Sequence, residues 1–532
     1  MFSIKHIQLQ NSGVLNPLVS DYLKKVPQLD SFYSFFPDWN GFSSAIKQAN
    51  YEALNRESLY SVLSSQAGQV NNTSEESHQN LHLLKHKNTF TITTGHQLCL
   101  FTGPLYFVYK ILSCINLAEE LKLKFPEHNF VPVYWMAGED HDFAEVNHFR
   151  LFGKTLSWTS SETGSVGDFD TSGLEEVFVQ FKEIAGTSET AEELSNLFSE
   201  AYLKHKTLIS ATRYLVNALF GKYGIVCIDG NEKEFKQQFT DILSEDVFNT
   251  TSSIHVEKDI KALSALGYSN QVNPRKINCF YTQKGLRARI EYEDGVYKVI
   301  GTDIRFSETE LRKKLELEPE VFSPNVVLRP LYQQRILPNL AYVGGPGELA
   351  YWLQYKSMFQ AYKVFFPVLV PRNFVTIFEK QVTDRLTKLS FSLEDIFLPE
   401  AKLIQTLVDR SGVKPEFGNE NQELQALFEK IQIKASAIDK TLEPAVKAEL
   451  QKALTGLQNI EAKMNRAIKQ RSETEINQIR SVRQKLFPDE QAQERVDNFS
   501  QYYLKYGNTV IDILKREFSV LDFRHTLLIE ET

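Results

Sequence analysis

The sequence has little of what marks several large classes of protein. Only four of its 532 residues are cysteine (Cys99, Cys114, Cys227 and Cys279), and none forms a CxxC pair. This scarcity excludes a disulfide framework and a cysteine zinc cluster, and it is typical of a reducing compartment. No apolar run approaches the roughly 20 residues that span a bilayer, and the first ten residues lack a signal peptide's apolar core. We therefore expect a cytoplasmic protein with no membrane contact.

Positive charge is also scarce, and the common nucleotide fingerprints are missing. The net charge is −8 and the isoelectric point lies near 5.9, which argues against nucleic-acid partners, tRNA included. Neither G-x-G-x-x-G nor G-x-x-x-x-G-K-[ST] occurs, so a dinucleotide fingerprint and a P-loop are not supported. What is present is an ordinary globular composition, 42% hydrophobic and 24% charged, long enough for two or three domains.

Residues 89–138 have the pattern of a strand, a helix and a second strand. A β-rich run over 89–94 ends at Gly95, and a second turn, Thr102-Gly103-Pro104, opens an amphipathic helix. An apolar strand over 130–136 follows. Two strands joined by a helix are parallel with a right-handed crossover, so both strand ends lie at one edge of the sheet. That edge is where open α/β sheets bind ligands.

The same pattern returns about 200 residues later. An apolar strand over 340–343 stops at the glycine-rich turn 344–348, and a helix and a strand over 366–370 follow. The short apolar run 224–229 fits a further parallel strand. The sequence therefore predicts an α/β fold with five parallel strands.

Two stretches interrupt this sheet and a helical region follows it. Residues 150–222 read as a helical insertion, and alternating apolar and polar residues over 262–300 predict antiparallel hairpins. The predicted organisation has seven segments: 1–88, mainly helical; 89–149, first half of the core; 150–222, helical insertion; 223–245, core strand and helix; 246–325, antiparallel β insertion; 326–400, second half of the core; 401–532, helical coiled-coil domain.

The last of these segments has a heptad pattern. Leu450, Leu457 and Met464 are seven residues apart, with Ala453, Ile460 and Ala467 at the complementary positions. Residues 427–442 supply a partner helix, so we expect a long antiparallel hairpin, with a final helix over about 494–518 packed on it. Such an arm commonly mediates dimerisation; packing within one subunit is the alternative.

An acidic cluster follows the strand that ends at Gly138. Asp140, His141 and Asp142 could bind a metal, bind or deprotonate an amine, or form a structural capping network. No HxxxH spacing is present, and three adjacent residues rarely converge on one ion. We therefore predict no metal and place acid–base work or substrate binding here.

The helix-opening turns at Gly103 and Gly345 suggest anion binding, because helix N-termini expose N–H groups. Arg372 follows a strand end directly and is a candidate ligand for phosphate or carboxylate. Lys110 lies six residues into its helix and can simply be solvated. Trp135 can be a pocket wall or ordinary core.

Taken in order, several unusual motifs resemble one known family. TTGHQLCLFTGPLYFVYK, VPVYWMAGEDHDFAEVNH, VGGPGELAYWLQY, VLVPRN and LFPDEQAQERVDNF are similar to the bacillithiol-biosynthesis cysteine-adding enzymes, the BshC family, over essentially the whole chain. The resemblance implies a Rossmann-like core related to nucleotidylyltransferases, two connecting-peptide insertions and a C-terminal coiled coil. It also implies a ligase that joins L-cysteine to glucosaminyl malate.

The chain departs from the pattern of its relatives in one place. Members of that family have Gln-Gln after the first glycine, where this chain has His96-Gln97. An imidazole titrates and a glutamine amide does not, which leaves the role of position 96 open. The family also lacks the synthetase HIGH and KMSKS signatures, so the synthetase mechanism does not transfer.

The resemblance and the residues together give a set of predicted roles. Amide formation needs an activated carboxylate, and we expect ATP or ADP as the cofactor. The predicted catalytic residues are Asp140, His141 and Asp142. The predicted substrate-binding residues are Gly95, His96, Gln97, Thr102, Gly103, Tyr106, Trp135, Glu145, Gly345, Glu348, Arg372 and Asn373. Leu486 and Arg495 are predicted to form a second nucleotide pocket, with a helix-packing junction as the alternative.

Two other classes of function stay open from the sequence. One is a nucleotidyltransferase that uses the same sheet edge without amide chemistry. The other is a non-catalytic dimeric partner protein of a thiol pathway, with the arm as its working surface.

Overall fold

The computed structural model describes residues 2–410, 417–519 and 521–531. Contacts divide the chain into two units. The core unit comprises His6–Thr376 and Ala492–Leu527, and the arm unit comprises Met1–Lys5, Ile377–Gln491 and Leu528–Thr532. None of the helices in the described ranges combines the length and apolar character needed to cross a bilayer.

A five-stranded parallel sheet forms the centre of the core unit, with strand order β13-β12-β2-β3-β6. The predicted fold is confirmed, because these are the five strands that the sequence indicates. Their bounds are β2 Thr89–His96, β3 Asn129–Met136, β6 Val226–Asp229, β12 Asn339–Gly344 and β13 Val368–Pro371. Nearly every residue on them is buried, as expected for a parallel sheet covered on both faces.

The order of the strands creates a switch point between β2 and β12. From β2 the chain moves outward through β3 to β6, whereas from β12 it moves to the opposite edge at β13. Neighbouring connections that leave in opposite directions open a crevice at the carboxyl ends of the strands. The strand register keeps these ends level, since Gly95 lies opposite Trp135 and His96 opposite Met136.

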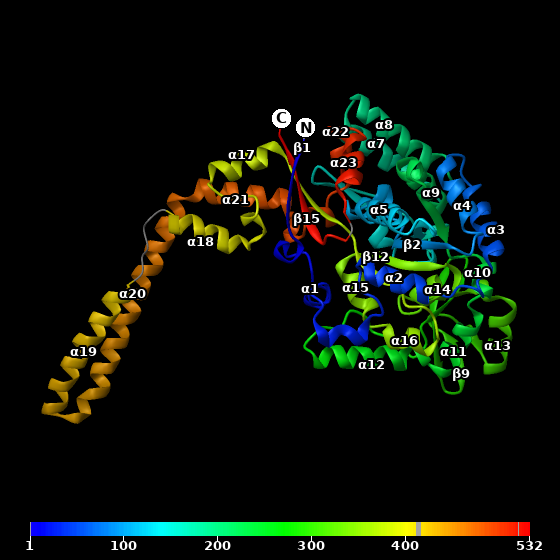
Figure 1. The fold of residues 1–532 in the computed structure, drawn as a ribbon. Coiled ribbons are helices and arrows are strands. Elements are labelled where there is room, and N and C mark those ends of the chain that lie inside the picture. The colour runs from blue at the N-terminus through cyan, green and yellow to red at the C-terminus, as the bar shows by residue number, and fades with distance from the viewer. Residues whose placement is uncertain (1, 411–416, 520, 532) are drawn as a thin grey trace. The chain divides into compact units, whose positions relative to one another are not determined.

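Helix α5 (Tyr106–Lys124) crosses from β2 to β3 and lies along the sheet (Figure 1). Side-chain alternation divides the apolar residues of the sheet between two clusters. Ile92 and Val343 pack with Leu117 of α5 on one face, and Val133 and Tyr342 pack on the other. A substitution on one strand therefore affects one layer of the core.

Residues 148–220 begin with a β-hairpin, β4 (His148–Leu151) and β5 (Lys154–Ser157). Helices α7 (Leu174–Ala185), α8 (Glu189–Phe198) and α9 (Leu208–Phe220) follow. The second interruption carries a five-stranded antiparallel sheet of order β10-β9-β8-β7-β11, which confirms the predicted hairpins. Its bounds are β7 Cys279–Gln283, β8 Leu286–Glu293, β9 Val296–Val299, β10 Arg305–Phe306 and β11 Phe322–Pro324. That both stretches are connecting-peptide insertions stays a prediction.

The remaining elements of the core unit pack around these sheets. They are α1 Pro17–Leu23, α2 Trp39–Gln48, α3 Arg56–Ala67, α4 Glu75–Leu83, α6 Phe143–Val146, α10 Lys233–Gln237, α11 Thr240–Asn249, α12 Thr251–Ala265, α13 Glu308–Leu317, α14 Arg329–Ile336, α15 Pro346–Trp352 and α16 Lys356–Ala361. A three-stranded sheet has the order β1-β15-β14, with β1 Phe2–Gln8, β14 Phe374–Phe378 and β15 Arg524–Glu530.

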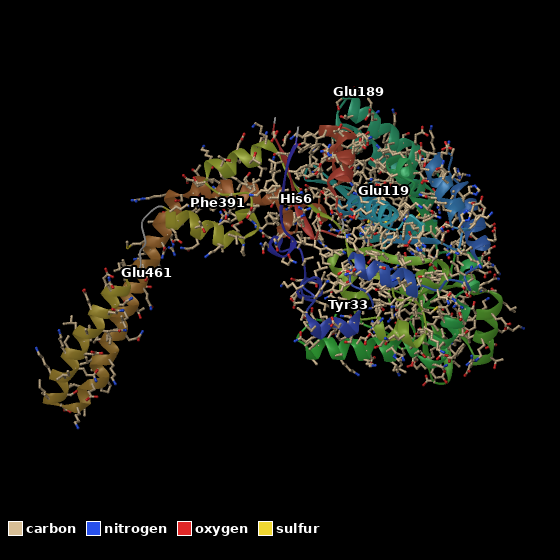
Figure 2. All side chains as sticks on the ribbon, viewed as in Figure 1. His6, Tyr33, Glu119, Glu189, Phe391 and Glu461 are labelled. Atoms are coloured by element: carbon tan, nitrogen blue, oxygen red, sulfur yellow. The ribbon has the colours of Figure 1, made fainter. Side chains whose placement is uncertain are left out.

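The arm unit is helical. Helices α19 (Gly418–Ile438) and α20 (Glu443–Arg471) form the predicted hairpin and lie side by side (Figure 1), with Glu461 on α20 labelled in Figure 2. The other helices are α17 Lys380–Lys388, α18 Glu400–Arg410 and α21 Glu473–Leu486. Helix α19 has no buried residue in the single chain, although it packs along α20.

The prediction of one final helix packed on the arm is wrong. The segment folds as α22 (Phe499–Tyr506) and α23 (Thr509–Glu517), separated at Gly507, and it belongs to the core unit. Phe499 packs on Phe101, with ring centroids 5.4 Å apart. Burial of aromatic surface there explains why this segment folds with the core unit.

Candidate active site

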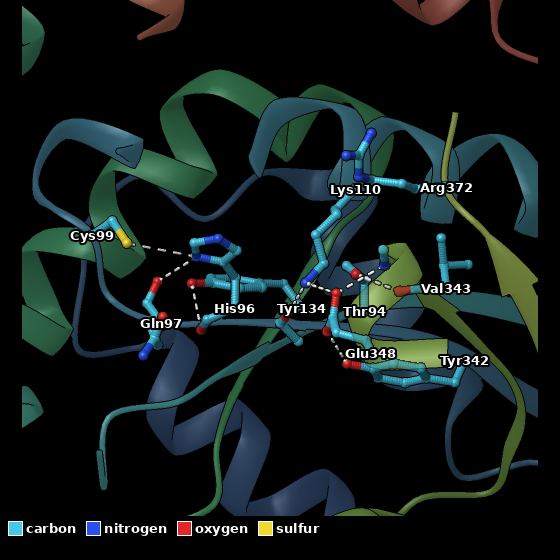
Figure 3. Close-up of polar contacts among 12 residues, drawn as sticks. Thr94, His96, Gln97, Cys99, Lys110, Tyr134, Tyr342, Val343, Glu348 and Arg372 are labelled. Carbon is cyan, nitrogen blue, oxygen red and sulfur yellow. Dashed lines mark hydrogen bonds and ion pairs between the residues drawn. The ribbon is translucent and has the colours of Figure 1, made fainter. Parts of the chain in front are cut away.

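The structure gathers most of the predicted site residues at the carboxyl edge of the parallel sheet. Figure 3 shows His96, Gln97, Glu348 and Arg372 among them. Gly95, His96 and Gln97 close β2, and the acidic cluster follows β3. Glu348 lies in the first turn of the helix after β12. This convergence follows from the parallel strands, which end at the same edge.

Gln97 connects two carboxylates of the acidic cluster. Its Nε2 donates hydrogen bonds to Asp140 Oδ2, at 3.0 Å, and to the Glu145 carboxylate. The backbone N–H of His141 donates to Asp140 Oδ1 at 2.7 Å. Burial opposes ionisation of Asp140, but hydrogen bonds from His141 and Gln97 outweigh it and hold the pKa of this carboxyl well below its usual value. Asp140 is therefore a fixed negative charge and a weak base.

Arg287 on β8 contacts the imidazole of His141. Its Nη1 lies 2.8 Å from His141 Nδ1, and its guanidinium stacks on Phe280 at 3.9 Å from the ring centroid. Because arginine only donates, Nδ1 accepts and the imidazole proton lies on Nε2. Nε2 is then the ring nitrogen that can donate to a substrate, and the catalytic role of His141 stays a prediction.

Asp142 is the cluster's carboxylate with the most freedom to react. It is exposed, and in the part of the chain that the structure describes its carboxylate has no hydrogen bond or ion pair. A carboxylate without a partner can accept a proton from a bound amine.

Two further charged groups at this edge escaped the sequence analysis. Lys236 of α10 is fully buried, pairs with Glu139 and donates to the Phe322 carbonyl at 2.8 Å. The charge of Glu139 is thus already compensated. Asp229 ends β6 opposite Met136, and burial raises its pKa to about 7. A carboxyl that titrates near neutrality in such a place is typical of active sites.

Lys110 is not solvated as expected, because α5 turns this residue onto the sheet. Its side chain is 3% exposed and its Nζ lies 2.8 Å from Glu348 Oε2. It also donates to the Gly95 carbonyl (Figure 3). Glu348 accepts hydrogen bonds from Tyr342 Oη at 2.6 Å and from the Gly345 N–H at 2.9 Å. Glu348 therefore caps α15, and the Gly345 N–H is engaged by a side chain of the chain itself.

His96 is buried between the rings of Tyr106 and Phe107, with centroids 5.3 and 5.1 Å away. Its Nδ1 lies 2.8 Å from the Gln97 carbonyl oxygen, so Nδ1 carries the proton. Burial and the nearby Lys110 ammonium lower the pKa of His96 to about 3. The imidazole is therefore neutral at physiological pH.

The turn before α5 is strained and is held by a distant segment. Phe101, Thr102 and Gly103 all have positive φ, at 46°, 70° and 61°. The amide of Asn498 donates to the carbonyls of Phe101 and Gly103 at 2.7 and 2.6 Å. The Leu105 N–H donates to the backbone carbonyl of residue 497 at 2.7 Å. Strain maintained in this way is common at functional sites.

Arg372 has a counter-charge within the protein. Glu494 accepts hydrogen bonds from both of its Nη atoms, at 2.5 and 3.0 Å, and both side chains are buried. Asn373 is likewise occupied, since Ser113 donates to its Oδ1 at 3.0 Å. These contacts give both residues a structural role. A substrate contact by either residue stays a prediction.

The remaining predicted residues have mixed surroundings. Trp135 is 2% exposed and packs edge-on against Tyr332, which favours its role as core. Arg495 lies 5.8 Å from the Tyr106 ring centroid within the core unit. Leu486 is 1% exposed among the helices of the arm unit. The nucleotide pocket predicted from Leu486 and Arg495 stays a prediction.

The sequence matches two family models that together cover nearly the whole chain. Residues 2–373 match the N-terminal Rossmann-like domain of the bacillithiol biosynthesis BshC family, and residues 375–530 match its C-terminal coiled-coil domain. A protein of Flavobacterium psychrophilum, named "Putative cysteine ligase BshC", is 45% identical over 95% of this chain and 96% of its own. A protein of the same name from Christiangramia forsetii is 40% identical over 98% of both chains. The chain therefore belongs to the bacillithiol biosynthesis BshC family.

Proposed function

We propose that this chain is a ligase that forms an amide bond between L-cysteine and the amine of glucosaminyl malate. The observation that carries the proposal is the extent of the likeness to relatives named as cysteine ligases, 45% identity over 95% of the chain. The described site agrees with amine chemistry, because its acidic cluster offers fixed negative charge beside one unpaired carboxylate.

The acidic cluster suits an amine that attacks an acyl group. Asp140 and Glu145, connected by Gln97, attract the ammonium form of the acceptor. Asp142 accepts the proton that the nitrogen loses, and the Nε2–H of His141 donates to the oxygen that gains negative charge. The amide C–N bond forms as the activating group leaves the cysteine carboxyl.

A nucleotide is the expected source of activation, as an acyl adenylate or an acyl phosphate. The predicted phosphate site at the Gly345 turn fits such a group poorly, since Glu348 accepts from the Gly345 N–H. The proposal therefore places no phosphate at the Gly345 N–H.

The test is incubation of the purified chain with glucosaminyl malate, L-cysteine and ATP, followed by mass spectrometry of thiol product and nucleotide. Release of AMP with the product indicates an adenylate, and release of ADP indicates an acyl phosphate. If both substrates bind and no product forms, the ligase assignment is refuted for this chain with ATP.

We further infer a homodimer that forms through the arm. Ile433 and Ile438 of α19 are 72% and 83% exposed in the single chain, and Ile460 of α20 is 49% exposed. Apolar residues so exposed on a hairpin with heptad spacing are typical of a coiled-coil interface.

Light scattering during size-exclusion chromatography tests this inference. We expect twice the 61.1 kDa of one chain for the wild type and a single-chain mass for an Ile433→Lys/Ile438→Lys variant. Ile254→Lys is the control, since Ile254 is 60% exposed in the core unit. A wild-type mass of one chain would refute the dimer.

A location in the cytoplasm is part of the same proposal. All four cysteines are free thiols and buried, which agrees with a reducing compartment.

A further inference from the structure

Arg329, the first residue of α14, contributes a guanidinium to the switch point of the sheet. Its Nη1 lies 3.8 Å from the position that a Cβ on Gly95 would occupy. Its Cζ lies 5.8 Å from the Trp135 ring centroid and 5.6 Å from that of Tyr342. The guanidinium therefore lies beside the end of β2, next to rings on the two neighbouring strands.

Arg329 differs from several other cations of the site because, in the described part of the chain, no carboxylate lies within ion-pair distance of its guanidinium; the Glu348 charge acts on it from farther away. Lys110, Lys236 and Arg372 each pair with a glutamate. Among the described residues, Nη1 of Arg329 donates a hydrogen bond to the neutral Oε1 of Gln333 at 3.0 Å, and the guanidinium also interacts with the Tyr351 hydroxyl. Nη2 is buried and has no partner within the same residues.

Gln333 adds a second donor that lacks an acceptor. Its side chain is fully buried, and within the described chain its Nε2 has no hydrogen-bond partner. A buried charge and a buried amide without acceptors are costly, so most proteins satisfy such groups. An acceptor that carries negative charge would satisfy both.

We propose that Arg329 and Gln333 form a subsite for a substrate carboxylate at the β2–β12 switch point. A guanidinium pairs with a carboxylate through two parallel hydrogen bonds, and the Gln333 amide supplies a further donor beside it. The identity of the ligand rests on the proposed function, whose two substrates, cysteine and the malate conjugate, both carry carboxylates.

Calorimetric titration of the full-length protein with three probes tests the subsite: L-malate, L-cysteine and inorganic phosphate. We expect Arg329→Gln to weaken binding of one carboxylate probe by about 10- to 100-fold, the usual effect of losing a hydrogen bond to a charged group. The probe that loses affinity identifies which substrate occupies the subsite. Arg329→Lys keeps the charge without the planar fork, so an intermediate loss is expected.

Arg335→Gln is the matched control. Arg335 lies on the same helix, is exposed and pairs with Asp241 at 3.0 Å, so its loss should leave all three affinities within about threefold. Thermal unfolding supplies a second readout. The bound carboxylate should raise the melting temperature of the wild type and not of Arg329→Gln.

The proposal is overturned if Arg329→Gln binds both carboxylates like the wild type, or if phosphate alone loses affinity. Failure of the proposed function looks different. In that case malate or cysteine still binds in an Arg329-dependent way, yet no product forms with both substrates and ATP.

Discussion

The buried ion pair of Lys110 and Glu348 allows a direct test of whether the charges at this edge of the sheet stabilise one another. The ammonium is almost fully buried, and the carboxylate side chain is 23% exposed. Removal of one partner of a buried pair leaves a charge without compensation and costs about 3–5 kcal/mol, whereas removal of both costs less. Because Glu348 keeps some contact with water, we expect losses at or just below the lower end of that range.

The two single variants should differ. In Glu348→Gln, Lys110 loses its counter-charge, and burial already lowers the pKa of this lysine. In Lys110→Met, Glu348 still accepts from Tyr342 and Gly345. We expect losses in the free energy of unfolding of about 3 kcal/mol for Glu348→Gln and about 2 kcal/mol for Lys110→Met. The double variant should lose about 2 kcal/mol, well below the sum.

Tryptophan fluorescence during urea unfolding suits this measurement, because all four tryptophans (Trp39, Trp135, Trp158 and Trp352) lie in the core unit. The signal therefore follows this unit without interference from the arm. Losses that add in the double variant, or single losses below about 0.5 kcal/mol, would refute a coupled buried pair.

Three other variants test the site. Asp142→Asn should lower kcat by about 10²–10⁴-fold in a folded protein if Asp142 is the base, with the exposed Glu176→Gln as the control in the same product assay. The pKa of His96 is near 3 in the folded chain, whereas that of an ordinary histidine is 6.5. This side chain therefore binds a proton more readily when the chain is unfolded. Stability should therefore fall as pH decreases below about 6.5, and His96→Gln should reduce that slope in unfolding titrations. Asn498→Ala should destabilise the core unit by about 2–4 kcal/mol. The change leaves two buried carbonyls without donors and removes the N-cap of α22. An unchanged midpoint in urea unfolding would contradict this expectation.

The sequence carries enough information to predict the parallel sheet and its functional edge. Most of the strands are nearly continuous apolar runs that stop at glycine or at a polar residue, as strands covered on both faces do, whereas threonines interrupt the apolar residues of β2. Because neighbouring parallel strands end at the same edge of a sheet, the side chains that follow Gly95 and Gly138 are expected to lie close together. Local pattern and general topology are sufficient for these predictions.

Other parts of the site depend on contacts that have no local signal. Arg287 is 146 residues from His141, and Glu494 is 122 residues from Arg372. Nothing near a single arginine in a sequence shows which side chain it will contact. Lys110 looked solvated for the same reason, since its burial depends on how α5 docks on the sheet.

The hydrogen bonds from the Asn498 amide to the carbonyls of Phe101 and Gly103 also determine when the site can form in the cell. Asn498 lies 395 residues after Gly103, and a ribosome adds about 5–20 residues per second. The turn is therefore synthesised roughly 20–80 s before the residue that holds it, and residues 377–491 of the arm unit are synthesised in between. A nascent chain that stops at residue 373 contains every strand of the parallel sheet but neither Asn498 nor Glu494. Assembly of this active site is thus among the last events in the making of the protein.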